Sequence, residues 1–455
     1  MNILVFGGSP KGETSVTMQY VKWLCQNFPE HNLTVVQAAQ PIRELEQDTA
    51  AIAKIGAKVQ AADGILWAFP LYVAMPHAGL KRFVELISER QIGDAFRGKH
   101  CAILTTSIHF LDHTAIEYMR GISEDLGVVM DEVFSAEMQD LTRPGGTKQL
   151  GQFFRKWISR IQSGSISGRR TAPIRYESKP YTPTGQKPRV NPIKVGIVTQ
   201  SGVSANLDGM VGQIAGHFTK TEIYDLSTMH IAGNCTGCLR CGYDNTCLYE
   251  GKDEVIGAYR SLRECDAILF CGFVADRYFS ARWKTFVDRM FFNTHTPVLP
   301  GKPIGFVVSG PLRQLDNLRS ILEGVYGAMQ MRLAGFATDE DEDIDGGIAA
   351  LAESLYFLAE SGYNPPQQFP AICGRKVFRD EVFGGLCGVF PADHRYYKKH
   401  GWYNFPQKRI GARLGGFLMR SAMRIPAIRK NMQDNMKSNM ILSYRKVVKQ
   451  ETIGE

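Results

Sequence analysis

The sequence lacks any long apolar run. No stretch of about 18 consecutive apolar residues occurs in its 455 residues, which predicts that no helix spans a membrane. The first ten residues, MNILVFGGSP, hold no basic residue, and their apolar run is too short for a secretory signal. Cysteine is also scarce: ten residues are too few for a disulfide scaffold of this length. These absences predict a reducing compartment, and we expect a cytoplasmic protein.

Excess positive charge is missing from most of the chain. The formal net charge is +8, but residues 371–455 hold 17 Lys and Arg against six Asp and Glu, so this stretch carries +11 and the remainder about −3. A body without excess positive charge argues against nucleic acid as a partner. Near the end, RIGARLGGFLMRSAMRIP places arginines on one helical face and apolar residues on another. We expect a basic amphipathic helix whose charged face is solvated, docks an acidic redox protein, or contacts an anionic membrane peripherally.

The sequence does contain two segments of similar organisation. Residues 164–192 are rich in Pro, Ser, Gly and charge and have no apolar period, which predicts a linker. On either side, short strand-like apolar runs alternate with longer helical patterns, as in a parallel sheet flanked by helices. We therefore predict an α/β protein with two tandem doubly wound parallel sheets, in residues 1–163 and 193–364, and a basic helical extension in residues 365–455.

The two segments align with each other in two blocks. NILVFGGSPKGETSVTM (2–18) aligns without gaps to KVGIVTQSGVSANLDGM (194–210), and WAFPLYVAMPHAGLKRFVE (67–85) aligns to FCGFVADRYFSARWKTFVD (270–288). Because both blocks lie at a strand-to-helix junction and keep their order, they indicate a duplication. The second copy has extra residues between the blocks, and a four-cysteine stretch lies there. The identical pairs in the second block are Ala78/Ala281, Lys81/Lys284, Phe83/Phe286 and Val84/Val287.

The first copy opens with an anion-binding pattern. The strand-like ILVF is followed by GGSPKGETS and then by a helical pattern. Loop amides and the helix N-terminus can hold an anion, with hydroxyls donating to it and a lysine adding charge. The loop is neither GxGxxG nor a Walker loop, which disfavours a dinucleotide or a nucleoside triphosphate. A phosphate monoester such as that of FMN suits it better; the alternative is a turn that only caps the helix. The expected phosphate ligands are Ser9, Lys11, Thr14 and Ser15.

Two more loops are expected at the same edge of the sheet. In open α/β sheets, ligands bind at the carboxyl ends of the strands. An apolar strand ends at Pro70, so Leu71, Tyr72 and Val73 lie at that edge, and Tyr72 is placed to flank a flat ring. ILTTSIHF is the third loop, with three hydroxyls at a strand end. These are Thr105, Thr106 and Ser107.

These motifs, taken together, resemble the NADPH-dependent FMN reductase group of flavodoxin-like proteins over residues 1 to about 162. The resemblance implies FMN, with its phosphate on the first loop and its ring against the second and third. It also implies that the nicotinamide of NAD(P)H stacks on the flavin. The family usually has Ser-Asn where this chain has Ser15-Val16, which weakens the assignment of individual phosphate contacts.

NCTGCLRCGYDNTC, residues 234–247, puts four cysteines in one turn-rich stretch. Cys-x2-Cys-x2-Cys brings successive thiolates to neighbouring irons of a cubane cluster, and the fourth cysteine follows closely enough to reach it. Zinc sites usually have two separated pairs of ligands, so zinc fits less well. Four cysteines without a metal remain the other alternative. The ligand candidates are Cys235, Cys238, Cys241 and Cys247.

The cysteine stretch resembles the iron–sulfur flavoproteins, a branch of the same group, over residues 193–363. The resemblance implies a 4Fe-4S cluster beside FMN. The second copy departs from the flavin pattern, with Phe273 aligned to Pro70 and Ala275 to Tyr72. We therefore expect a division of labour in which the first copy binds FMN and the second binds the cluster. In the family, flavin and cluster of neighbouring subunits approach each other, and a fused pair can make the same contact within one chain.

The resulting functional prediction is an NAD(P)H-dependent flavin oxidoreductase that passes electrons between small-molecule donors and acceptors, with homo-oligomers plausible. Flavin and cluster together convert two-electron donors to one-electron acceptors. No side chain is needed as a nucleophile, and His77 and His109 either pack or assist proton transfer. The alternatives are a cluster-free FMN or quinone reductase and a non-catalytic electron-transfer or redox-sensing flavoprotein.

Overall fold

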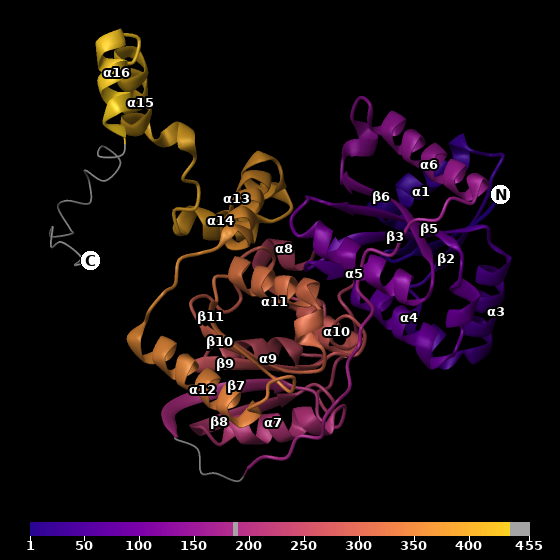
Figure 1. The fold of residues 1–455 in the computed structure, drawn as a ribbon, viewed down its shortest axis with the longest axis horizontal. Coiled ribbons are helices and arrows are strands. Elements are labelled where there is room, and N and C mark those ends of the chain that lie inside the picture. Colours follow the sequence, from indigo (N-terminus) through magenta and orange to yellow (C-terminus); the bar gives the residue numbers. More distant parts are fainter. Residues whose placement is uncertain (185–189, 437–455) are drawn as a thin grey trace. The chain divides into compact units, whose positions relative to one another are not determined.

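The computed structural model describes residues 1–184 and 190–436 and divides into two compact units. The larger unit runs from Met1 to Tyr396 and the smaller unit from Tyr397 to Glu455. The larger unit contains two parallel sheets, each with helices on both faces (Figure 1). The predicted tandem flavodoxin-like α/β architecture is thereby confirmed.

The first sheet has the parallel strand order β2-β1-β3-β5-β6, with the short β4 antiparallel at the end of β3. Its central strands β1 and β3 are mostly apolar because both of their faces are covered, whereas the edge strands β2 and β6 carry polar residues. Ile3 and Val5 face the core formed with α1 and α6, whereas Leu4 and Phe6 face the core formed with α3, α4 and α5. The bounds are β1 (Asn2–Gly7), α1 (Val16–Asn27), β2 (Asn32–Gln37), α2 (Ile42–Gln47), α3 (Thr49–Ala61), β3 (Gly64–Tyr72), β4 (Met75–Pro76), α4 (Ala78–Glu89), β5 (His100–Ser107), α5 (Asp112–Asp125), β6 (Val129–Glu137) and α6 (Gly146–Ser163).

The second sheet repeats this order as β8-β7-β9-β10-β11, again all parallel. Val195 and Ile197 of β7 face the core formed with α7 and α12, and Val198 faces the other side. The bounds are β7 (Asn191–Thr199), α7 (Ala205–Ala215), β8 (Phe218–Asp225), α8 (Cys241–Asp244), α9 (Val255–Leu262), β9 (Ala267–Phe273), α10 (Ala281–Arg289), β10 (Pro303–Ser309), α11 (Asp316–Ala328), β11 (Arg332–Thr338) and α12 (Ile344–Ser361).

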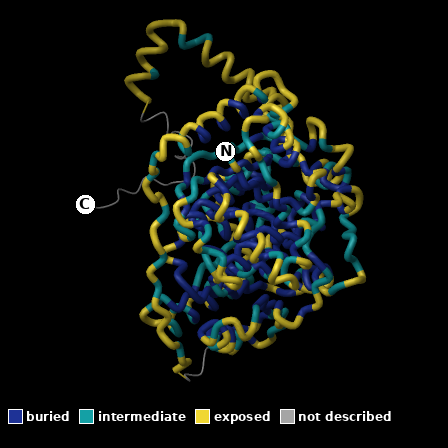
Figure 2. The backbone as a smooth tube through the Cα atoms, turned by 90° about the vertical axis from the view of Figure 1, so that its right-hand side faces the viewer, coloured by how far each residue is buried: buried dark blue, intermediate teal, exposed yellow. Residues whose placement is uncertain are grey.

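The remaining helices follow the second sheet. The helix α13 (Phe369–Gly384) packs against α11 within the larger unit, and α14 (Pro391–Lys399) follows it. The smaller unit contains α15 (Ile410–Ala422) and α16 (Pro426–Asp434). Burial is concentrated in the strands and the inward faces of their helices (Figure 2). Among the described residues, no helix is both long and apolar enough to cross a membrane.

The segment after α6 runs without regular secondary structure but is held at several points. The Thr171 N–H donates to Glu124 of α5 at 2.8 Å. Farther along, the Thr184 N–H donates to Asp345 of α12 at 2.9 Å, and the Tyr181 hydroxyl donates to the same carboxylate. Residues 164–184 are therefore anchored first to α5 and then to α12. The assignment of residues 164–192 as a separate linker stays a prediction.

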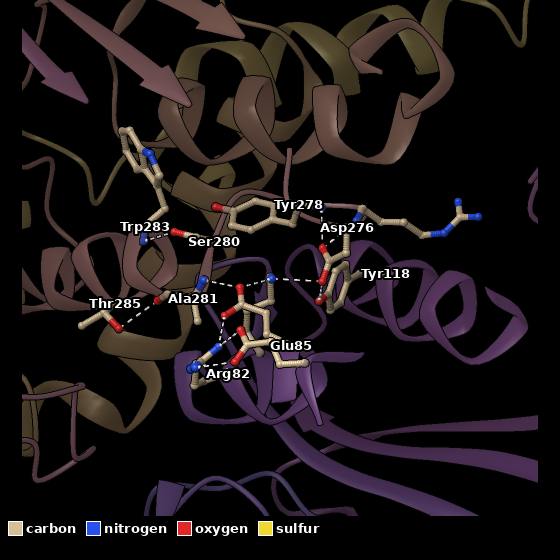
Figure 3. A network of polar contacts seen from close by, with 12 residues as sticks. Arg82, Glu85, Tyr118, Asp276, Tyr278, Ser280, Ala281, Trp283 and Thr285 are labelled. Atoms are coloured by element: carbon tan, nitrogen blue, oxygen red, sulfur yellow. Dashed lines mark hydrogen bonds and ion pairs between the residues drawn. The ribbon is translucent and has the colours of Figure 1, made fainter. Parts of the chain in front are cut away.

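The two halves pack through equivalent helices, α4 of the first and α10 of the second. The Ala78 N–H at the start of α4 donates to the Asp288 carboxylate at 2.8 Å. The Ala281 N–H at the start of α10 donates to the Glu85 carboxylate at 2.7 Å, a contact that Figure 3 shows. These residues are equivalent in the alignment, so each helix caps the N-terminus of the other. Such reciprocal contacts are those of an isologous, two-fold interface, here within one chain.

A buried lysine accompanies each of these carboxylates. Lys81 contacts Glu85 at 2.7 Å and Asp276 of the other half at 3.0 Å. Its counterpart Lys284 contacts Asp288 and donates to the Tyr72 carbonyl oxygen at 2.9 Å. Burial lowers the pKa of Lys284, and the neighbouring Asp288 opposes this shift. Because both lysines are fully buried, each depends on its carboxylate for compensation of its charge.

Candidate functional site

The loop that follows β1 has the geometry of an anion cradle at the start of α1. Ser9 and Ser15 are buried, and the Ser15 hydroxyl caps α1 by accepting from the Met18 N–H at 3.2 Å. The Thr14 hydroxyl donates to the Lys11 carbonyl oxygen at 2.8 Å, and the Lys11 side chain is exposed. No carboxylate of the described chain is hydrogen-bonded to the amides of residues 8–15. Most of these amides, however, donate to oxygens of the protein itself, as the Gly12 N–H does to the Ser9 carbonyl oxygen at 3.2 Å. The donors that the loop can offer to a phosphate are therefore its remaining N–H groups, the Ser9 hydroxyl and the Lys11 side chain.

The corresponding loop of the second half is already occupied by its own carboxylates. Asp225 accepts from the Ser201 N–H at 3.0 Å and from the Ser201 hydroxyl, and Asp208 accepts from the Gly202 N–H at 3.1 Å. Although burial raises the pKa of Asp225, hydrogen bonds from Ser201 and Ser227 hold it below its ordinary value. A negative charge thus fills the anion position, which excludes a phosphate by repulsion.

The residue that differs between the two cradles can be identified from strand register. Gly7 pairs with Gln37 in the first sheet, and its equivalent Thr199 pairs with Asp225 in the second. Gln37 therefore occupies the place of Asp225. Both polar atoms of the Gln37 side chain are buried without a partner among the described residues. A neutral side-chain amide whose buried atoms lack hydrogen-bond partners is expected where a ligand supplies those partners.

The second loop is a strained hairpin between β3 and β4. Tyr72 pairs with Met75, and the two residues that turn between them, Val73 and Ala74, have positive φ angles of 42° and 61°. A β-branched valine in this region is a backbone outlier of the sort found at ligand sites. Pro70 and Leu71 precede the turn and are half-buried.

The third loop ends β5 and is linked to the first. The Thr106 and Thr17 hydroxyls lie 2.6 Å apart, which joins this loop to α1. The Ser107 hydroxyl accepts from the His109 N–H at 2.9 Å, while the buried Thr105 hydroxyl has no partner among the described residues. Since β1, β3 and β5 are parallel neighbours, the structure brings the three loops to one edge of the first sheet.

The two histidines considered for proton transfer differ in their surroundings. His77 is buried; its Nδ1 accepts from the Gly79 N–H at 3.0 Å, and its Nε2 lies 2.8 Å from the Cys235 carbonyl oxygen. This pairing fixes the neutral tautomer with the proton on Nε2, and burial lowers the pKa of His77. Both ring nitrogens are therefore engaged in holding structure. His109 is half-exposed and lies 3.1 Å from Asp112.

The four cysteines line one small cavity in the second half. The cavity has a volume of about 30 Å³, and the chain wraps around it through left-handed residues Gly237, Leu239 and Asn245. Burial, reinforced by the neighbouring thiols, raises the pKa of Cys241 to about 12. Within residues 1–184 and 190–436, no group of three or more His, Cys, Asp or Glu side chains is arranged so that it could hold a metal ion. The cavity-lining cysteines are Cys235, Cys238, Cys241 and Cys247.

The cysteine loop lies directly against the first half. A Cβ atom placed on Gly237 would come within 2.4 Å of the Tyr72 hydroxyl and 2.8 Å of the Lys11 side chain, so only glycine fits there. Burial raises the pKa of Tyr72, and the adjacent Cys235 adds to this shift. The structure therefore brings two sequence-predicted groups together, the loops of the first half and the cysteines of the second.

Arg289, which the sequence pattern did not reveal, completes the wall of the cysteine cavity. Its guanidinium contacts Asp253 at 2.8 Å and stacks over Tyr249 at 4.3 Å. Its Nε is buried and has no partner among the described residues. A buried cation with a spare donor beside four thiols suits an anionic ligand set.

Part of the C-terminal extension covers the other side of the cysteine loop. A Cβ atom on Gly242 would come within 2.3 Å of the Val389 carbonyl oxygen. Asp393, fully buried, accepts from the Thr294 hydroxyl and lies 2.7 Å from His295 Nδ1. This segment therefore packs on the buried part of the loop, at Cys241 and Gly242, within the larger unit, whereas Cys238 stays exposed. Only its position in three dimensions reveals this role, because the contacting residues are far apart in sequence.

A large cavity of about 830 Å³ lies between the halves. It is lined by the aligned counterparts of the flavin loops, including Val203 and Ala275, and by Ile42 and Arg43 of α2. In the first half α2 follows β2, and in the second half the cysteine loop follows the equivalent strand, β8. The approximate two-fold relation between the halves therefore places this cavity at the position that corresponds to the contact at Gly237. The first half has no cysteine loop to fill it.

The fold and these loops define a flavodoxin-like protein of two tandem halves. The model of the NADPH-dependent FMN reductase family matches residues 1–129 and again residues 201–343, more than half of the chain. The chain belongs to this family.

Individual relatives cover smaller parts of the chain. An iron-sulfur flavoprotein from Archaeoglobus fulgidus is 32% identical over 89 residues, 19% of this chain and 40% of that protein, so less than half of the relative is matched. The solved flavoenzyme FerB from Paracoccus denitrificans, an NAD(P)H:(acceptor) oxidoreductase, is 15% identical over 36% of this chain and 98% of its own, with a TM-score of 0.29. General stress protein 14 from Treponema denticola, solved with FMN, is 12% identical over 36% and 99%, with a TM-score of 0.26.

Proposed function

We propose that this chain is an FMN-dependent oxidoreductase in which the first half holds FMN and the cysteines of the second half carry a 4Fe-4S cluster beside it. The observation that carries the proposal is the contact of Gly237, between the first two cysteines, with Tyr72 and Lys11. When bound, FMN exchanges a hydride with NAD(P)H and releases electrons singly, and a cluster accepts one electron at a time.

The residues of the first half have separate roles in this proposal. Ser9, Lys11, Thr14 and Ser15 surround the phosphate, where Gln37 keeps the cradle free of negative charge. Pro70, Leu71, Tyr72 and Val73 flank the ring on one side. Thr105, Thr106 and Ser107 face its polar edge. No group among them acts as a nucleophile.

The residues around the cysteines orient the loop. His77 holds the Cys235 carbonyl oxygen at 2.8 Å, which fixes the loop to the first half. Arg289 places positive charge next to the thiols, which favours their ionised form as ligands. Tyr72 packs on one side of the loop and Val389 on the other.

The cavity of about 30 Å³ holds roughly one water, so a four-iron cluster requires the cysteine loop to open outward as it is loaded. The sequence supports the cluster through the even spacing of its first three cysteines, and the A. fulgidus relative is itself named an iron-sulfur flavoprotein.

Analysis of iron, acid-labile sulfide and zinc in anaerobically purified protein tests this assignment. We expect four irons and four sulfides per chain, with absorbance near 400 nm that bleaches on reduction. The Cys241→Ser variant loses iron and keeps FMN, whereas the matched Cys25→Ser variant keeps both. Zinc in place of iron, or no metal after reconstitution, contradicts the cluster and leaves the alternative of a cluster-free FMN or quinone reductase.

A further inference from the structure

The smaller unit exposes an unusual amount of apolar surface. Of the 22 large apolar side chains that are exposed in the described chain, eight lie in residues 410–436. No residue of α15 or α16 is buried, and Figure 2 shows the tube of both helices mostly as exposed. By contrast, α12 of the larger unit buries its apolar residues against a sheet. The apolar side chains of α15 and α16 therefore stay exposed among the described residues of that unit.

Several of these side chains lie on one face of α15. Ile410, Leu414 and Phe417 recur at intervals of four and three residues, which places them on one side of the helix. They are 74%, 57% and 54% exposed. Arg413 and Arg420, seven residues apart, lie along one edge of this face, and the Arg420 guanidinium lies over the Phe417 ring at 5.6 Å. The helix thus presents an apolar strip bordered by arginines.

The net charge of the chain is concentrated in the same unit. Residues 397–455 hold 13 Lys and Arg against three Asp and Glu, a balance of +10, whereas the remaining residues carry −2. A long-range attraction of this unit to a negatively charged surface follows, weakened by salt.

We propose that α15 lies in the plane of an anionic lipid surface, with its apolar strip in the headgroup–acyl boundary and its arginines at the headgroup phosphates. A helix with an apolar strip, a basic edge and low overall hydrophobicity lies on a membrane rather than across it. An acidic protein satisfies the charge but does not require a continuous strip of large apolar side chains. The lipid surface satisfies both properties, and this inference does not depend on which cofactors the larger unit holds.

Flotation of the full-length protein with lipid vesicles tests this inference. We expect binding to vesicles of phosphatidylcholine mixed with phosphatidylglycerol and none to pure phosphatidylcholine. Each basic residue near an anionic surface strengthens partitioning roughly fivefold, so the double variant R413Q/R420Q should bind about 25-fold more weakly at low salt. The matched variant K54Q/K58Q, with the same charge change on exposed positions of α3, should bind like the wild type.

The variant F417S/L418S separates a lipid surface from an acidic protein. It retains every charge, and both positions are exposed, so the fold is unaffected. We expect at least a tenfold loss of vesicle binding and unchanged binding to polyglutamate. Vesicle binding equal to that of the wild type would show that charge alone acts and would overturn the proposal in favour of an acidic partner. Absence of wild-type binding to anionic vesicles, or loss of self-association in F417S/L418S without any vesicle binding, would also overturn it.

Discussion

The first and second halves of this chain share a fold, a strand order and a pair of mutually capping helices, yet their ligand loops have diverged. In the first half a neutral Gln37 stands beside a Gly- and Ser-rich loop whose amides meet no carboxylate. In the second half Asp225 accepts from the Ser201 N–H, the equivalent of the Ser9 N–H, and Asp208 accepts from the Gly202 N–H. The difference teaches that a duplicated loop can acquire carboxylates that disfavour a phosphate while the strand order of the sheet is kept.

The same asymmetry appears at the contact between the halves. On one side of the two-fold axis, the cysteine loop reaches Tyr72 and Lys11. On the other side, where no such loop exists, a cavity of about 830 Å³ remains. The insertion in the second half therefore accounts for both features: it supplies the cysteines, and its absence in the first half leaves the opening.

The largest expected effect is on stability, and it comes from removing the carboxylate that pairs with a buried lysine at the contact of α4 and α10. Asp288→Asn leaves the buried Lys284 with one carbonyl contact and no counter-charge, so the free energy of unfolding should fall by about 3–5 kcal/mol. The equivalent Glu85→Gln should cost only about 1 kcal/mol, because Lys81 keeps Asp276. Urea unfolding followed by circular dichroism measures both. Equal losses would show that the two sides of the interface are energetically alike, against this account.

A smaller effect is expected when the first half is given the carboxylate that the second half has beside its equivalent loop. Gln37→Glu places a carboxylate where the second half has Asp225, so the FMN affinity should fall at least about 100-fold through repulsion of its phosphate. Riboflavin, which has no phosphate, should bind as it does to the wild type. Isothermal titration with both flavins measures the difference.

Gln60→Glu is the matched control, because it makes the same change at an exposed position of α3. It should leave FMN affinity unchanged. If Gln37→Glu also leaves FMN affinity unchanged, the phosphate does not lie at the loop after β1.

The fold could be predicted from the sequence because the spacing of apolar residues and the turn residues determine secondary structure locally. The alternation of buried strands and amphipathic helices predicts both sheets, and the gapless match of residues 67–85 to 270–288 places α4 and α10 in equivalent positions. The order of the loops along one sheet edge follows from the parallel topology. The individual ligand residues at that edge stay a prediction.

Other features depend on tertiary contacts that no local pattern encodes. The cover of the cysteine loop by Val389 and Asp393 joins residues separated by roughly 100 to 150 positions in the chain. The role of Arg289 depends on the side of α10 that faces the loop. The blocked second cradle was partly visible in the sequence, because Asp208 aligns with Val16, but its hydrogen bonds to the loop appear only in the structure.

The most direct test of the division between the halves is the number of FMN molecules bound per chain in the purified protein, measured from flavin absorbance after denaturation against protein concentration by amino-acid analysis. The account predicts one FMN per chain, lost in Gln37→Glu and retained in Gln60→Glu. Two FMN molecules per chain, or none after incubation with excess FMN, would contradict it.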